Sequence, residues 1–434
     1  MKNEYLLQYE AKKTTPEKIV EHVQSGWNCG SDIGLSLPPA ILAAFDKYVK
    51  ENKLTNITYN TVLEWFSIGA YEEETPGVTG VSWFSNVFAR KAVNQGVADV
   101  MPSHFHEMPH FIETSEQIDA VFLCVSPMDE NGYFSTGPSA SLSESLLKKA
   151  KRVYLEVNEH MPRSVSGPTV HISQVDALCE NHVELPDYPR PEPDEISKRI
   201  AAYIAEEVPD GANIQFGIGA IPDAVGALLV EKRNLGIHTE MFTESMVDLI
   251  EAGAVTNELK PLHQGKTVAS FAFGSKRVYD YIHENEDVKM LPVQKVNDPR
   301  VISQLPNVRS INSAIEIDFY GQVCAESMGA MHFSGTGGQV DFVRGALWSP
   351  GGKSFIAFPS TAKGGTVSRI KPTLSPGAVV TTSKNDVNYV VTEYGIADLR
   401  GKTVSERTKA LIQLAHPKFR EELTFEAKKR NIII

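Results

Sequence analysis

Ala212-Asn213-Ile214-Gln215-Phe216-Gly217-Ile218-Gly219-Ala220-Ile221-Pro222 is the stretch of this 434-residue chain that decides its fold. It predicts a short buried strand up to Phe216, a turn with two glycines, and a helix that begins near Pro222. A strand that passes through a glycine turn into a helix is the building unit of α/β folds with parallel sheets. The turn also presents backbone N–H groups at the start of a helix, where they can hold a phosphate or an oxyanion.

The order helix, glycine, strand, glycine, helix occurs twice along the chain, with equal spacing between the glycines. Gly26 and Gly34 flank the first strand, as Gly211 and Gly219 flank the second. Strands that alternate with helices predict open, largely parallel sheets covered by helices. We therefore expect an α/β fold made of two tandem, similar domains. Coincidence stays open as an alternative, because unrelated α/β segments share this order.

A proline-rich segment separates the two halves. Four prolines fall in the eight positions from Pro186 to Pro193, which rules out a regular helix or a central strand there. The chain is also longer than one hydrophobic core usually supports, so two domains are expected. We place the linker at 186–194, an N-terminal domain at 1–185 and a C-terminal domain at 195–434.

Glu240 is the candidate catalytic residue. It follows Leu235-Gly236-Ile237-His238-Thr239, the next expected strand after the glycine turn. A carboxylate buried at a strand end costs free energy unless it is paired or does chemistry, and N–H groups of a nearby turn stabilise developing negative charge. In the first half Asn56–Asn60 looks equivalent to Gly236–Glu240, so that Asn60 takes the place of the glutamate. We therefore expect a carboxylate nucleophile in the second half alone.

A second glycine-rich segment lies further along the chain, Phe333-Ser334-Gly335-Thr336-Gly337-Gly338-Gln339-Val340-Asp341-Phe342. Three glycines in four positions permit positive φ angles and let a ligand approach the backbone closely. A flexible hairpin is the structural alternative. If both glycine segments converge on Glu240, the carboxylate is surrounded by backbone donors.

Other motifs carry weaker signals. His104, His106 and His110 have a spacing that metal ligands can have, but no matching cysteine or carboxylate set accompanies them, so no metal site is predicted. Ser360–Thr366 lacks the residue order of a phosphate-binding P-loop, and no G-x-S-x-G motif occurs, which disfavours an NTPase and a serine hydrolase.

Composition narrows the class of protein. The chain carries 54 acidic and 42 basic residues, a formal net charge of −12, and lacks a basic stripe, so nucleic acid is not expected as a partner. Its four cysteines are widely spaced, which favours a reducing cytoplasm. Neither a signal peptide nor an apolar stretch long enough for a membrane span is recognisable.

Taken together, these motifs resemble one enzyme family over nearly the whole chain. The likeness is carried by Gln215–Val225, Leu235–Met241, Phe333–Phe342 and Val390–Lys402, and in the first half by Ser126–Phe134. The chain resembles family I CoA-transferases of the acetyl-CoA hydrolase/transferase group, and most closely the 4-hydroxybutyrate and butyrate CoA-transferases.

The resemblance implies an acyl-CoA:carboxylate CoA-transferase that moves CoA between acetyl-CoA and a short-chain acid such as 4-hydroxybutyrate or butyrate. Its ping-pong mechanism would pass through a glutamyl-CoA thioester on Glu240. By position, the family's oxyanion donors map to the backbone N–H groups of Ile218 and Gly337. The residues that would line the CoA site are Gln215, Gly217, Ile218, Gly219, Ala220, Ile221, Gly335, Gly338 and Gln339.

The resemblance further implies CoA as a substrate, with no tightly bound cofactor and no metal. The expected partners are acyl-CoA and short-chain carboxylates, with no nucleic acid and no membrane, in a homodimer or homotetramer. Two other functions stay open. One is an acyl-CoA hydrolase that uses the same glutamate, and the other is a non-catalytic CoA-binding module.

Overall fold

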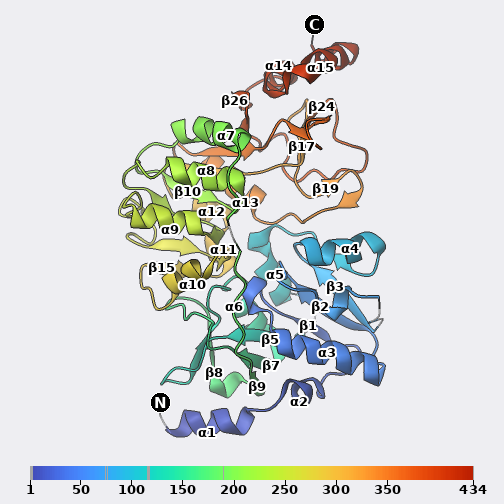
Figure 1. The fold of residues 1–434 in the computed structure, drawn as a ribbon, viewed down its shortest axis with the longest axis vertical. Helices are drawn as coiled ribbons and strands as arrows, with labels where there is room; N and C mark the ends of the chain where they lie inside the picture. The colour runs from blue at the N-terminus through green and yellow to red at the C-terminus, as the bar shows by residue number, and fades with distance from the viewer. Residues whose placement is uncertain (1–2, 74, 76, 115–117, 189, 434) are drawn as a thin grey trace. The chain divides into compact units, whose positions relative to one another are not determined.

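The computed structural model describes residues 3–73, 75, 77–114, 118–188 and 190–433. Met1 and Lys2, and Pro189 of the expected linker, lie outside the described residues. The chain divides into two compact units, one of residues 1–188 and 268–296 and the other of residues 189–267 and 297–434. Each unit is built around its own sheet (Figure 1).

A parallel sheet forms the centre of the first unit. Among the described residues it has seven strands in the order β4-β3-β2-β1-β5-β7-β9, and each neighbouring pair is parallel. The strands are β1 (Asn28–Gly30), β2 (Ile57–Thr61), β3 (Val78–Ser82), β4 (Asp99–Val100), β5 (Ile118–Val125), β7 (Ala150–Val157) and β9 (Ala177–Glu180). From β1 the chain adds β2, β3 and β4 on one side and then β5, β7 and β9 on the other, so the direction in which strands are added reverses beside β1.

Helices cover this sheet, and their apolar faces form its core. The helices before the linker are α1 (Asn3–Lys12), α2 (Pro16–Val20), α3 (Pro39–Asn52), α4 (Val87–Gln95), α5 (Met108–Thr114) and α6 (Ser143–Lys149). Phe45 of α3 packs against Tyr59 of β2 and Phe122 of β5, with ring centroids 5.5 and 6.0 Å away. A short antiparallel pair, β6 (Tyr133–Ser135) and β8 (Thr169–His171), lies outside the main sheet.

Residues 268–296 belong to the first unit although they follow the linker. They include β14 (Phe271–Ala272), α10 (Lys276–Ile282), β15 (Val288–Met290) and α11 (Val293–Val296), and β13 (Thr267–Ala269) leads into them. Backbone bonds hold them there, from Ala140 N–H to Ser270 O and from Val293 N–H to Ser141 O. This division differs from the expected one, which assigned all of 195–434 to the second domain. Such long-range pairing leaves no local mark in the sequence.

The second unit has a mixed sheet that is parallel except at one edge. Its order over the described residues is β11-β10-β16-β21-β25-β26, and only β25 and β26 pair antiparallel. The strands are β10 (Asn213–Phe216), β11 (Gly236–Ile237), β16 (Val308–Asn312), β21 (Lys353–Ala357), β25 (Tyr389–Thr392) and β26 (Gly395–Asp398).

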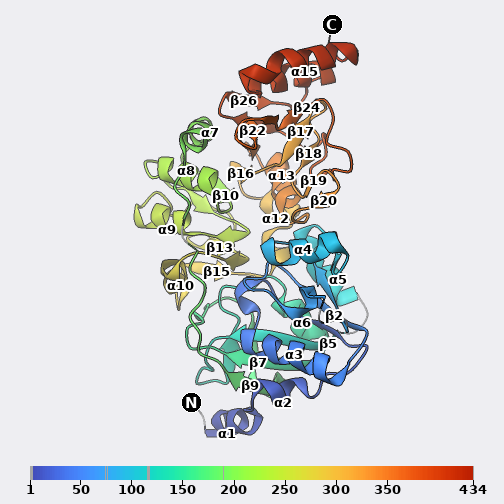
Figure 2. The same ribbon diagram turned by 45° about the vertical axis from the view of Figure 1, so that its right-hand side comes forward.

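Helices lie on both faces of this sheet. Figure 2 shows α7 (Glu195–Glu206) and α8 (Ala220–Leu228) on one side of β10 and β16, and α12 (Pro299–Ile302) and α13 (Gln339–Trp348) on the other. The remaining helices are α9 (Glu244–Glu251), α14 (Val404–Leu414) and α15 (Pro417–Lys429). Smaller strands lie outside the main sheet. A three-stranded sheet has the order β18 (Val323–Cys324), β17 (Glu316–Asp318) and β24 (Ile370–Lys371), and two pairs are formed by β19 (Ser327–Met328) with β20 (Met331–His332) and by β22 (Thr361–Ala362) with β23 (Val367–Ser368).

The two sheets share one order of strands. The sequence β2-β1-β5-β7-β9 in the first unit corresponds to β11-β10-β16-β21-β25 in the second, and all of these pairs are parallel. The expected fold class, two tandem α/β domains with largely parallel sheets covered by helices, is thereby confirmed. Ligands of such sheets bind beyond the carboxyl ends of the strands, next to the point where the strand order reverses. In the second unit that point lies at β10, which carries the glycine turn.

In the part of the chain that the structure describes, no helix combines the length and the apolar character that a membrane crossing requires.

Candidate active site

The glycine turn begins where β10 ends. Gly217 follows the strand, and Gly219 is the N-cap of α8 with φ of 129°, a value that favours glycine. Among the described residues, a Cβ on Gly217 would meet the Met241 side chain alone, at 3.9 Å, so the backbone here is open to a ligand. The first N–H groups of a helix have no partner within the helix, which makes the start of α8 a site for negative charge.

Glu240 lies between β11 and β12 (Met241–Phe242), and its side chain is half-buried. Asn297 Nδ2 donates a hydrogen bond to Glu240 Oε2 over 2.7 Å. Asn297 is fully buried, and within the described residues its Oδ1 has no hydrogen-bond partner. The amide therefore fixes one carboxylate oxygen and keeps an acceptor available beside it.

The second glycine segment approaches the same carboxylate. A Cβ on Gly338 would lie 1.7 Å from Glu240 Oε2 and 2.3 Å from Asn297 Nδ2, so only glycine fits at this position. Gly338 is also the N-cap of α13, whose dipole favours negative charge at this end. The segment is no flexible hairpin: the hairpin β19–β20 precedes it, and Gly335, Gly337 and Gly338 are all buried.

The surroundings raise the pKa of Glu240 to about 7. Burial is the main cause, the hydrogen bond from Asn297 acts in the opposite direction, and the nearby charge of Asp341 adds to the increase. Near neutral pH the carboxylate is therefore divided between its two protonation states. Perturbed groups of this kind are typical of catalytic sites.

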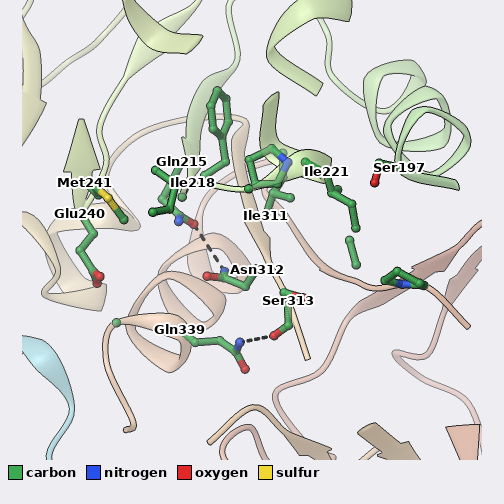
Figure 3. Close-up of a pocket in the computed structure, with 18 residues that line it drawn as sticks. Ser197, Gln215, Ile218, Ile221, Glu240, Met241, Ile311, Asn312, Ser313 and Gln339 are labelled. Carbon is green, nitrogen blue, oxygen red and sulfur yellow. Dashed lines mark hydrogen bonds between the residues drawn. The ribbon is translucent and has the colours of Figure 1, made fainter. Parts of the chain in front are cut away.

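A cavity of about 340 Å³ connects these features (Figure 3). Glu240 and Met241 lie at one side of the close-up and Ser197 at the opposite side, with Ile218 between them. Of the predicted site residues, those that line the cavity are Gln215, Gly217, Ile218, Gly219, Ala220, Ile221, Glu240, Gly338 and Gln339. Gly335 and Gly337 are not among the lining residues.

Polar side chains line one wall of the cavity. Ser310 Oγ donates to Gln215 Oε1 over 2.9 Å, and Asn312 Nδ2 donates to Ser310 Oγ over 2.9 Å. Gln339 Nε2 donates to the carbonyl oxygen of Ser313 over 2.7 Å. These bonds join the carboxyl ends of β10 and β16 to the start of α13, so the wall is held in shape before a ligand binds.

Sequence reasoning missed several residues of this site. They are Asn297 and, along the cavity wall, Ser197, Phe216, Pro222, Met241, Ile311, Asn312, Ser313, Ala357 and Pro359. The wall residues at 311–313 lie at the carboxyl end of the buried strand β16, and a search at the carboxyl ends of all expected strands would have found them. Asn297 has no such signal, because it lies in a loop far from Glu240 in the chain.

The first unit has a cavity of about 550 Å³ at the corresponding place, beyond β1 and β2. Its described lining residues include Asn60 and Trp83 but no charged side chain. This difference supports the expectation that only the second half carries a catalytic carboxylate.

The alignment that set Asn60 against Glu240 is wrong by two residues. Strands β1 and β10 occupy corresponding places in the two sheets. Their first residues, Asn28 and Asn213, pair with Thr58 and Gly236, so Thr58 corresponds to Gly236. Counting two residues on, Asn60 corresponds to His238, and the glutamate lies beyond the strand register that the two halves share. The error arises because both strands begin within similar apolar segments, which do not define register.

Among the described residues, no group of three or more His, Cys, Asp or Glu side chains is placed to hold a metal ion. The ring centroids of His104 and His106 are 6.2 Å apart and the rings are stacked. All four cysteines are buried and free.

Two family models match the chain. The model described as acetyl-CoA hydrolase/transferase N-terminal domain matches residues 1–185, and that described as acetyl-CoA hydrolase/transferase C-terminal domain matches residues 274–427. Glu240 lies between the two matched ranges.

Relatives match over most of their length. A 4-hydroxybutyrate coenzyme A transferase of Clostridium kluyveri is 47% identical over 342 residues, 79% of this chain and 80% of that protein. A succinyl-CoA:cyclohexane-1-carboxylate CoA transferase of Geobacter metallireducens is 42% identical over 100% of this chain and 98% of that protein. The crystal structure of RipA from Yersinia pestis superposes with a TM-score of 0.94 at 38% identity, covering 99% of this chain and 100% of that one.

Proposed function

This chain belongs to the acetyl-CoA hydrolase/transferase family and is a CoA-transferase, and from that premise we propose that it moves CoA between acetyl-CoA and a short-chain carboxylate such as 4-hydroxybutyrate or butyrate. The resemblance found in the sequence is confirmed at the level of the family. Glu240 is the covalent carrier of the proposed reaction.

One observation carries this assignment. The Glu240 carboxylate is held by Asn297, lies against Gly338 at the start of α13, and shares a cavity with the glycine turn before α8. A carboxylate nucleophile needs a defined position and donors for the oxyanion, and the hydrogen bond from Asn297 and the two glycine segments support this role for Glu240.

The first half-reaction forms a thioester on the enzyme. The Glu240 carboxylate attacks the thioester carbonyl of acetyl-CoA, the C–S bond breaks, and an acetyl-glutamyl anhydride and CoA thiolate form. The thiolate then attacks the glutamyl carbonyl of the anhydride. Acetate leaves, and Glu240 carries CoA as a glutamyl thioester.

The second half-reaction runs these steps backwards with a new acid. The acceptor carboxylate attacks the glutamyl thioester, which gives a new anhydride and releases CoA thiolate. Attack of the thiolate on the acyl carbonyl forms the new acyl-CoA and regenerates the Glu240 carboxylate. Since one thioester replaces another of similar free energy, the reaction requires no ATP.

The two glycine segments supply the proposed oxyanion donors. The Ile218 N–H lies in the turn that lines the cavity. For the second donor we favour Gly338 over Gly337, because Gly338 is the glycine in contact with the Glu240 carboxylate. Removing one such donor from an acyl-transfer site typically costs about a hundredfold or more in kcat.

The proposed CoA site is the cavity itself. Its polar wall of Gln215 and Asn312 presents amide groups at a distance from Glu240 along the cavity, where the amides of a pantetheine arm can find partners. Ile218 is 59% exposed and offers an apolar contact to the same arm. Gly335, predicted as a CoA-site residue, and Gly337, predicted as an oxyanion donor, are not among the residues that line the cavity, so this proposal assigns neither a contact with CoA.

The assignment is tested by replacing the nucleophile. Glu240→Ala protein, incubated with acetyl-CoA and butyrate, is expected to form no butyryl-CoA, whereas Glu251→Ala, which removes an exposed acid on α9, is expected to behave as the unmodified enzyme. Transfer by Glu240→Ala at an undiminished rate contradicts the assignment.

An acyl-CoA hydrolase that uses Glu240 is the second candidate, and the family description itself includes hydrolysis. In that case water intercepts the glutamyl thioester. Release of free thiol from acetyl-CoA at equal rates with and without an acceptor acid identifies a hydrolase. For the proposed transferase, thiol release without acceptor is slow, and adding acid gives acyl-CoA in place of thiol.

Borohydride reduction distinguishes the enzyme from a CoA-binding module that has no catalytic activity. Borohydride inactivates the protein after incubation with acyl-CoA only if a glutamyl thioester has formed.

The homo-oligomeric state, the cytoplasmic location and the absence of a tightly bound cofactor stay predictions. The four free cysteines fit the expected reducing compartment.

A further inference from the structure

The strand that leads to Glu240 is an edge strand. In the described sheet β11 has β10 as its one neighbour, and the N–H groups of Gly236 and His238 point to β10, bonding to Ala212 O and Ile214 O over 2.9 and 3.4 Å. The N–H and C=O of Ile237, the residue between them, therefore point the other way. Peptide groups on an open edge require partners, since unpaired groups are costly when buried.

Two side chains supply those partners. The Ile237 N–H donates to Asn257 Oδ1 over 2.8 Å, and Lys260 Nζ donates to the Ile237 carbonyl oxygen over 2.7 Å. Both residues come from the loop that follows α9, where Asn257 has a left-handed φ of 58°. The side-chain amide of Asn257 and the amine of Lys260 thus form the hydrogen bonds that the backbone of a neighbouring strand would otherwise form.

Lys260 is an unusual residue for this task. It is 2% exposed, and its Nζ also donates to the carbonyl oxygen of Lys266 over 2.6 Å. Burial lowers the pKa of Lys260 to about 7. Within the described residues its ammonium group is held by these two carbonyl oxygens and not by a carboxylate. A lysine buried in this way costs stability, so its presence calls for a compensating role.

The packing around the lysine is closed. A Cβ on Gly236 would lie 2.8 Å from Lys260 Cγ and 2.4 Å from Asn213 Oδ1, so the lysine stem crosses directly over the strand. Asn257 Nδ2 in turn donates to Thr267 Oγ1 over 3.1 Å. The loop is therefore held at both ends, and Ile237 lies between them.

We propose that Asn257 and Lys260 form a clamp on the backbone N–H and C=O of Ile237, and that this clamp positions Glu240 for attack. Glu240 lies three residues after Ile237. A shift of the clamped Ile237 backbone would therefore also shift the backbone that carries the carboxylate. Both residues are positioning residues, since neither lines the cavity. The inference rests on the proposed function, because it assigns them a role in the chemistry of Glu240.

The experiment compares three variants with the unmodified enzyme. Lys260→Met keeps the length of the side chain and removes its donors, Lys260→Arg keeps donors, and Asn257→Ala removes the other half of the clamp. Leu411→Ala is the control for stability, since Leu411 is fully buried on α14, which contributes nothing to the cavity. Measured are kcat and KM for CoA transfer at 25 °C, the thermal midpoint, and amide hydrogen exchange of the segment 235–242.

A misplaced nucleophile typically costs one to two orders of magnitude in rate, so kcat of Lys260→Met is expected to fall about tenfold to a hundredfold. KM for acyl-CoA is expected to change little, and the Ile237 amide to exchange faster. Lys260→Arg is expected to restore most of kcat, and Leu411→Ala to lower the thermal midpoint without lowering kcat.

A folded Lys260→Met enzyme with the unmodified kcat overturns the clamp and leaves the proposed function intact. If Lys260→Met does not fold, Asn257→Ala decides the question, and unmodified kcat with unmodified exchange at Ile237 overturns the clamp. Unmodified enzyme that transfers no CoA overturns the proposed function instead, and the exchange measurement still tests whether the clamp holds the strand.

Discussion

The Glu240 carboxylate lies in direct contact with the α-carbon of Gly338, where a Cβ would be 1.7 Å from Oε2. Gly338 is also the N-cap of α13, so the contact places the carboxylate at the positive end of a helix. Gly338, which has no side chain, therefore both contacts the proposed nucleophile and carries the backbone N–H that we propose as an oxyanion donor.

Gly338→Ala is expected to fold and to lose CoA-transfer activity. The added methyl group cannot share the space of Oε2, so the carboxylate must rotate away from its position. We expect kcat to fall by about a hundredfold, as for other displacements of reacting groups by about 1 Å. Steady-state kinetics with circular dichroism as a folding control measure this, and a folded variant that keeps most of its kcat contradicts the contact.

The pH dependence of the reaction follows from the pKa of Glu240. Attack requires the ionised carboxylate, and this group has a pKa of about 7. We expect kcat/KM for acyl-CoA to rise with pH up to about 7 and then to level off, because this parameter reports the free enzyme. A profile that is flat from pH 5 to 8 contradicts a pKa of about 7 for this carboxylate.

Two substitutions are expected to move that inflection in opposite directions. The hydrogen bond from Asn297 lowers the pKa of Glu240 and the charge of Asp341 raises it. Asn297→Ala is therefore expected to shift the inflection to higher pH, and Asp341→Asn to lower pH. Shifts in the reverse sense, measured over the same pH range, refute this account of the site's charges.

Glu240→Gln is expected to stabilise the fold above pH 7. The pKa of Glu240 is higher in the folded chain, about 7, than its ordinary 4.5, so the fold holds the proton more tightly than the unfolded chain does. That contribution is present below about pH 4.5 and is lost as the pH rises through about 7. At pH 8 the ionised group costs at most about 3 kcal/mol, which a neutral amide avoids.

Thermal midpoints of the two proteins at pH 5 and pH 8 measure this effect. The gain in midpoint for Glu240→Gln is expected at pH 8 and is expected to shrink towards pH 5. An equal gain at both pH values means that it does not arise from ionisation of this carboxylate.

The glycine turn offers a test with a matched control. Gly219 has φ of 129° and Gly253 has φ of 76°, and no described residue comes closer than 3.8 Å to a Cβ added at either position. Alanine at either residue is therefore strained by its backbone alone, at a cost of about 1 kcal/mol or more. Since only Gly219 lines the cavity, Gly219→Ala is expected to raise KM for acyl-CoA, and Gly253→Ala is expected to leave it unchanged. Equal effects on KM exclude a role of the turn in binding CoA.

Local chemistry in the sequence predicted much of this fold and site. The segment from Ala212 to Pro222 combines a buried strand, two glycines and a helix start, and the structure forms each of them in that order. Glu240 was predictable because a carboxylate in an apolar segment is costly and therefore informative. The resemblance to a known family then supplied its chemical role.

Contacts between distant segments were not predictable in this way. Asn297, which holds Glu240, and Lys260, which holds Ile237, lie in loops whose own sequences show no periodicity or motif. Their roles depend on how the chain returns to β11 after other elements have formed. The same holds for residues 268–296, which pack with the first unit through backbone bonds that no local pattern records.

The central claim, that Glu240 becomes covalently bound to CoA, is tested by mass spectrometry of the unmodified enzyme. The protein is incubated with acetyl-CoA, reduced with borohydride and digested, and the peptide that contains Glu240 is sequenced. Reduction of a glutamyl thioester converts the side-chain carboxyl to an alcohol, so the account predicts the loss of one oxygen and the gain of two hydrogens at Glu240, only when acyl-CoA is present. An unchanged Glu240 in enzyme that transfers CoA, or the same change on another carboxylate, contradicts it.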